Sequence, residues 1–79
     1  MDKKEIGKQL RDRRKKVSGI DRMVLDIQKL NETDPTYTRL TKATIINIER
    51  GRSNYTIDSL LTYLKYIGVT QKSFLSFLE

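Results

Sequence analysis

Apolar residues recur every three or four positions along most of the chain, in short stretches separated by residues that end helices. In the first stretch, residues 3–17, the side chains of Ile6, Leu10, Arg14 and Val17 fall on one stripe. This spacing is typical of an amphipathic helix. No stretch alternates apolar and polar residues for long enough to predict a strand. The sequence therefore predicts an all-α fold.

Capping and turn residues divide the rest of the chain into four more predicted helices, at about residues 20–30, 41–50, 56–67 and 70–78. Either Ser18 or Asp21 could cap the second helix, and the sequence leaves both open. Thr41 and Thr56 are suitable N-caps for the third and fourth helices. The prediction is thus a domain of five short helices.

Helix ends carry signals of their own. Gly51 and Gly68 fit the left-handed position that ends a helix, and all four glycines are interpreted as isolated punctuation of helices. Leu40 precedes the Thr41 cap and Ile45 follows it by four residues, which predicts a hydrophobic staple at the start of the third helix.

Two charged residues fall on apolar faces. Arg14 lies on the stripe of the first helix, and Glu49 follows Ile45 by one turn, on or beside the core face of the third. A charge taken out of water is costly unless it is paired. We therefore expect Arg14 to have a buried partner.

Length and composition limit the function. A chain of 79 residues has room for one core, so residues 1–79 are predicted to form a single domain. The chain has no Cys and no His, which removes disulfides, zinc knuckles, thiol nucleophiles and the commonest general base. We expect no enzymatic activity, metal, cofactor or small-molecule ligand. No apolar segment has the length of a signal peptide or a membrane span, which predicts a cytoplasmic protein away from membranes.

Positive charge is concentrated in one part of the chain. Residues 1–52 hold 14 Lys and Arg against 8 Asp and Glu, whereas residues 53–79 hold two of each. This asymmetry fits a surface for a polyanion, and it fits equally a solvated face that keeps the protein soluble. Arg13, Lys15 and Lys16 are assigned to solubility.

A series of motifs surrounds the third predicted helix. A TxxTI helix start at residues 41–45 and an IERG helix stop at residues 48–51 are followed by a polar turn, TIDSLLTYLKYIGV at residues 56–69 and TQKSFL at residues 70–75. In this order the motifs resemble the Cro/repressor-type helix-turn-helix proteins, also called the XRE family. The resemblance covers residues 40–75 and, less closely, residues 6–17. It implies a lambda-repressor-like domain that binds double-stranded DNA and regulates transcription, as a repressor of phage or mobile-element origin.

The resemblance also implies which residues meet DNA, because the third helix of such proteins lies in the major groove. The implied base contacts are Lys42, Ala43, Thr44, Ile46 and Asn47. Asn can pair bidentately with adenine, Lys can donate to guanine, and apolar side chains can contact thymine methyl groups. The implied phosphate contacts are Thr41, Arg50, Arg52, Ser53 and Asn54, with Arg22 added in one register of the second helix.

The resemblance also implies an ion pair between Arg14 and Glu49. Residues such as Phe74, Phe77 and Leu78 are more often core than interface residues. A helix this close to the terminus cannot easily bury all three, so a contact between two copies of the chain is the second interpretation, and we expect a homodimer.

The chain departs from the family between the second and third helices. The predicted loop, residues 31–38, belongs to an extended connection without Gly (NETDPTYTR), and Asp34 precedes a proline, which disfavours helix there. This segment, with Tyr37 and Arg39, could reach the DNA backbone or an adjacent groove, or it could equally be a mobile tether. In one register Asp26 occupies the position where the family has a small residue. The departure motivates an alternative function, a protein-interaction or antitoxin-like module that does not recognise an operator.

Overall fold

The computed structural model describes residues 2–52 and 54–76, with the side chains of residues 71 and 76 left aside. This part of the chain contains five helices and no strand: α1 (Lys3–Val17), α2 (Ile20–Thr33), α3 (Lys42–Glu49), α4 (Ile57–Tyr66) and α5 (Gln71–Ser76). The predicted all-α class with five short helices is confirmed. None of the described helices is long and apolar enough to cross a membrane.

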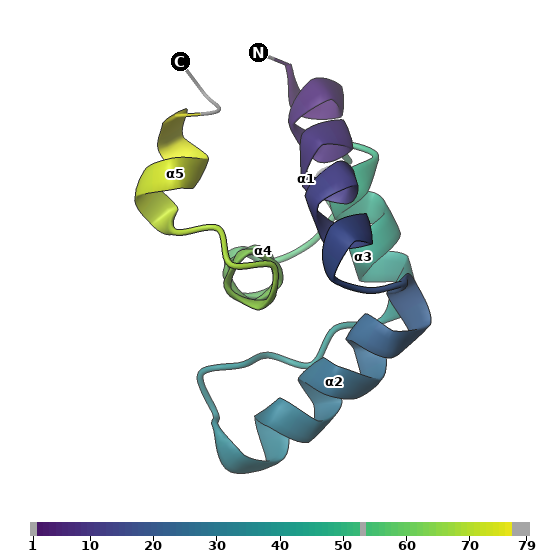
Figure 1. Cartoon of the computed structure of the whole chain (residues 1–79), viewed down its shortest axis with the longest axis vertical. Coiled ribbons are helices and arrows are strands. Elements are labelled where there is room, and N and C mark those ends of the chain that lie inside the picture. The colour runs from purple at the N-terminus through teal and green to yellow at the C-terminus, as the bar shows by residue number, and fades with distance from the viewer. Residues whose placement is uncertain (1, 53, 77–79) are drawn as a thin grey trace.

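Helix α3 is the centre of the arrangement. It packs against α1, α2 and α4, and α5 packs against α4. Figure 1 shows α3 running antiparallel beside α1, with α4 seen end-on and α2 crossing below them. The principal dimensions are 35 × 24 × 22 Å. Because α3 touches three other helices, their packing determines which of its faces meets solvent.

The core is made of side chains from every helix except α5, together with two residues from connecting segments. Leu40 and Ile45, the two members of the predicted staple, are both buried in it. The buried apolar residues are Leu10, Met23, Ile27, Leu40, Ile45, Ile48, Tyr63, Leu64 and Val69.

Most helix ends agree with the sequence signals. The hydroxyls of Thr41 and Thr56 accept hydrogen bonds from the backbone three residues on, each at 3.1 Å. Gly51 and Gly68 have φ angles of 72° and 77°. The start of α2 differs from both expectations, because Gly19 occupies the N-cap position and no side chain caps the helix.

Helix α2 is also longer than predicted. It continues to Thr33, so residues 31–33 belong to the helix and not to a loop. It ends at Asp34, whose backbone is extended, as expected for a residue before proline. The Asn31 amide donates to the Tyr37 carbonyl at 2.6 Å and thereby closes the connection back on the helix end.

The connection between α2 and α3 is tied to α4. The backbone N–H of Thr38 donates to the buried Thr62 hydroxyl at 2.9 Å. Lys65 donates to the Thr36 hydroxyl at 2.8 Å and lies 4.3 Å from the centre of the Tyr37 ring. These contacts argue against a mobile tether and fix the position from which α3 starts.

The interpretation of all glycines as punctuation is wrong for Gly7. This residue is buried within α1, where a Cβ atom would meet backbone atoms of α3: the carbonyl oxygen and carbon of Glu49, the latter at 2.7 Å, and the carbonyl oxygen of Ile48 at 2.8 Å. Only a residue without a side chain lets two helix backbones approach so closely. Gly7 therefore sets the distance between α1 and α3.

Candidate nucleic-acid interface

Helix α3 buries one face and presents the other. Ile45, Ile48 and Glu49 are buried. With 3.6 residues per turn, the side opposite these residues carries four others. We call these four the outward face: Ala43, Ile46, Asn47 and Arg50. Ala43 and Arg50 are exposed, and Ile46 and Asn47 are half-buried.

The remaining predicted base contacts lie at the edges of this face. The Lys42 ammonium is 3.8 Å from the Asp21 carboxylate, and both side chains are mostly exposed, so water and salt weaken their attraction. The Thr44 hydroxyl lies 3.0 Å from the Thr41 hydroxyl, which also caps the helix. To contact a base, Lys42 would have to exchange or share its partner Asp21, and Thr44 its partner Thr41.

Asn47 and Arg52 lie together at the end of α3. The backbone N–H of Arg52 donates to the Asn47 carbonyl at 2.9 Å. The Arg52 guanidinium donates to the Asn47 amide oxygen at 3.4 Å, a long and therefore weak bond. Asn54 is exposed in the following turn, and the predicted contact Ser53 lies outside the described residues. The structure thus brings the amide of Asn47, a predicted base contact, and the cation of Arg52 to one edge.

Arg22 is not brought to the outward face. Its guanidinium donates to Asp26 at 3.1 Å, and Asp26 accepts from the Tyr66 hydroxyl at 2.6 Å. Asp26 therefore faces α4 rather than occupying a close approach between α2 and α3. The Tyr66 hydrogen bond, with help from Arg22, lowers the pKa of Asp26 below its ordinary value.

The ion pair implied by the resemblance is present and buried. The Arg14 guanidinium donates to both carboxylate oxygens of Glu49, from Nε at 2.8 Å and from Nη2 at 2.9 Å. The third guanidinium nitrogen, Nη1, donates to the Ser18 carbonyl at 3.2 Å. A bidentate pair of this kind is both strong and directional. The pair links α1 to α3 in the middle of the domain.

Sequence reasoning missed a third member of this cluster. The Tyr63 hydroxyl, which is fully buried, donates to Glu49 Oε2 at 2.6 Å. Burial raises the pKa of Tyr63, and the hydrogen bond to Glu49 raises it further; the same carboxylate raises the pKa of Arg14. Glu49 therefore links α3 both to α1, through Arg14, and to α4, through Tyr63. Tyr63 falls among apolar residues in the sequence, and its pairing becomes visible only in the packed structure.

The expected dimer residues are only partly described. The Phe74 ring is half-buried and packs against the core, and it lines one cavity together with Leu10, Ile48 and Leu60, which favours its role as a core residue. Phe77 and Leu78 lie outside the described residues. The exposed apolar side chain of α5 is Leu75, at 58%.

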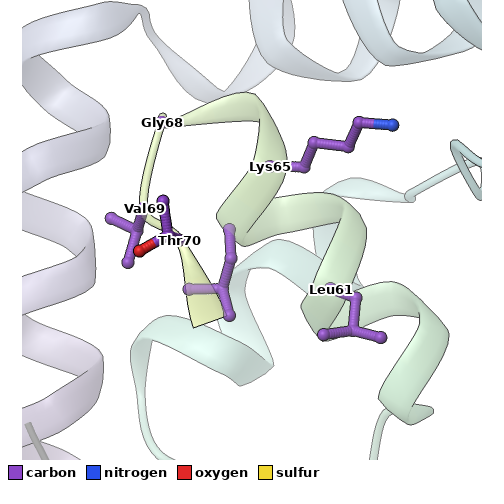
Figure 2. Close-up of a pocket in the computed structure, with 6 residues that line it drawn as sticks. Leu61, Lys65, Gly68, Val69 and Thr70 are labelled. Atoms are coloured by element: carbon purple, nitrogen blue, oxygen red, sulfur yellow. The ribbon is translucent and has the colours of Figure 1, made fainter. Parts of the chain in front are cut away.

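A cavity of about 350 Å³ lies away from the outward face, against α4 and the turn that follows it. Figure 2 shows Leu61 and Val69 on its walls, with Lys65 extending away from Val69 and Thr70. The described residues that line this cavity include one cationic side chain, Lys65, and no carboxylate to act with it as an acid–base pair. Among the described residues, no group of three or more Asp and Glu side chains is placed to hold a metal ion.

Comparison of the chain with models of protein families, with curated proteins and with solved structures finds no match.

Proposed function

We propose that this protein is a sequence-specific double-stranded DNA-binding regulator of transcription that inserts α3 into the major groove. The observation that carries the proposal is the outward face of α3, which combines an amide, a cation and small or apolar groups. An α-helix with its side chains is about 10–12 Å in diameter, and the major groove is about 12 Å wide and admits an α-helix. The size and chemistry of the face both fit.

Each residue of the outward face has a role in this proposal. Asn47 offers one acceptor and two donors, the set that pairs with adenine. Ala43 and Ile46 are suited to thymine methyl groups. Arg50 and Arg52 stand at the end of the helix and would hold phosphates, which position the protein without selecting a sequence.

The buried cluster around Glu49 supports this function indirectly. A helix that reads bases must keep its orientation when it meets DNA. Arg14 and Tyr63 hold Glu49 at the end of α3 from two other helices. We propose further that the protein acts as a homodimer and represses by occluding a promoter, which needs no additional domain.

Selection of binding sites from a randomised duplex library tests the proposal. The experiment is run in parallel with the wild type and with Asn47→Ala, which removes a half-buried amide of the outward face. We expect an enriched motif with two-fold symmetry, in which Asn47→Ala relaxes one position in each half-site by about 1–3 kcal/mol. Asn54→Ala, which removes an exposed amide at a predicted phosphate contact, is the control; it should weaken binding to all duplexes alike and leave the base preference unchanged.

The outcomes separate the parts of the proposal. A single, unpaired motif would keep DNA reading and exclude the dimer. If the folded wild type enriches no motif at physiological salt, the proposed function is wrong, and the alternative of a protein-interaction module would then be tested with candidate protein partners.

A further inference from the structure

Four basic residues form a row along α1. Lys4, Lys8, Arg11 and Lys15 are spaced by four, three and four residues, so they lie on one side of the helix. All four are exposed. We call them the basic row. The sequence alone assigned Lys15 to solubility, whereas the structure groups it with three other cations. The acidic residues of α1, Glu5 and Asp12, lie further round the helix, on the side away from α3.

The basic row borders the outward face of α3. Lys4 lines a surface hollow together with Arg50, Gly51 and Arg52. Arg11 lines a cavity of about 240 Å³ whose other walls include Ile46 and Arg50. Lys4 and Arg11 therefore lie on the same surface hollows as residues of α3 and its end that are expected to contact DNA.

The close packing of the two helices explains this juxtaposition. Gly7 allows the backbone of α1 to approach that of α3 at Ile48 and Glu49. With a larger residue there, α1 would stand further from α3. At the observed spacing, the basic row continues the surface that starts at the outward face.

We propose that the basic row binds the sugar-phosphate backbone of the same DNA duplex whose major groove α3 enters, an inference that rests on the proposed function. From Lys4 to Lys15 the row is about 16 Å long, at 1.5 Å per residue. With Arg50 and Arg52 it forms a continuous surface of six cations. Such a surface supplies affinity that does not depend on base sequence.

Two observations favour duplex DNA over other polyanions. Binding of an amphipathic helix to a membrane requires a free apolar face, whereas the apolar face of α1 is packed in the core through Leu10 and Ile6. Binding of single strands relies on aromatic side chains that stack on bases, and the basic row contains none. A rigid, purely cationic row is suited to a phosphate backbone of fixed shape.

The test is the salt dependence of binding to the selected duplex. The row variant carries Lys8→Gln, Arg11→Gln and Lys15→Gln. The control variant carries Lys16→Gln, Lys29→Gln and Lys72→Gln, which removes the same charge from exposed positions outside the row. Each phosphate contact contributes about 0.9 to the slope of log K against log salt. We expect the row variant to lower the magnitude of that slope by about 2–3, and the control to change it by less than about 1.

A second variant keeps the inference testable if the triple change affects folding. Lys8→Gln with Lys15→Gln leaves Arg11 in place beside α3 and should lower the slope by about 2. Circular dichroism melting shows that each variant is folded before binding is measured.

The results distinguish this inference from the proposed function. If the wild type selects a motif but row and control variants have equal slopes, the basic row does not touch DNA and the proposed function stands. If the row variant changes the preferred sequence, the row reads bases and the inference is wrong. If the folded wild type binds no duplex, both fall together.

Discussion

The hydroxyl of Tyr63 offers the sharpest test of the buried cluster. Replacing Tyr63 with Phe removes one oxygen atom and leaves the ring in the core. The hydrogen bond that is lost joins a fully buried donor to a carboxylate at 2.6 Å. We predict that Tyr63→Phe destabilises the domain clearly without unfolding it.

The magnitude follows from the partners that remain. A hydrogen bond to a charged group contributes about 1.5–3 kcal/mol. Glu49 keeps both bonds from Arg14 in the variant, so the loss should be about 2 kcal/mol, below the roughly 3–5 kcal/mol expected when a buried ion pair is broken. A domain of this length has a total stability of about 4–12 kcal/mol. Tm should therefore fall by about 8–16 °C.

Chemical and thermal unfolding followed by circular dichroism measures this loss. Tyr55→Phe is the matched control, because Tyr55 is half-buried at the edge of the core. Its replacement should change the free energy of unfolding by no more than about 0.5 kcal/mol. A neutral Tyr63→Phe would contradict the energetic importance of the bond.

A double-mutant cycle refines the test. Arg14→Met with Glu49→Leu replaces the ion pair by apolar side chains, a change that is often tolerated. In this background the Tyr63 hydroxyl has lost its acceptor, so Tyr63→Phe should be neutral or stabilising. The reasoning is refuted if Tyr63→Phe costs the same 2 kcal/mol in both backgrounds, since the energy would then not come from Glu49.

Two further predictions concern helix packing and acid stability. Gly7→Ala should destabilise the domain by about 2 kcal/mol in urea unfolding, because overpacking against the backbone at Glu49 outweighs the roughly 1 kcal/mol gain in helix propensity. The control is Gly19→Ala, whose added Cβ atom has nothing within 4 Å. Its free energy of unfolding should stay within about 1 kcal/mol of the wild type. Asp26 has a lowered pKa in the folded state, so it stabilises the fold above its ordinary pKa of 3.8 and loses that contribution as the pH falls below it. In Asp26→Asn, Tm should therefore fall less steeply as the pH drops below 3.8. If Tm falls as steeply in this variant as in the wild type, the Tyr66 hydrogen bond does not act through the charge of Asp26.

The local features of the fold could be predicted well from the sequence. The Thr41 cap, the left-handed Gly51 and the stripe of α1 from Ile6 to Arg14 depend on residues within one or two turns of each other, and all three are present. Val17, the last residue of the predicted stripe, is instead 51% exposed at the end of the helix. The boundary of α2 was predicted less well. Residues after Leu30 favour turns in isolation, but the helix continues until the residue before Pro35 stops it.

The candidate site divides in the same way. The sequence alone placed Arg14 and Glu49 on apolar faces, and it placed Asn47 and Arg50 on the opposite side of α3 from the core, because helical periodicity settles which residues share a face. It could not show that Tyr63 completes the buried cluster, nor that Gly7 lets α1 and α3 touch. Those facts depend on which helices meet and at what distance, and no short-range pattern encodes them. The position of the basic row beside α3 also depends on tertiary structure. The sequence places the four charges on one side of α1, but only the packing of α1 against α3 joins them to Arg50 and Arg52 in one surface.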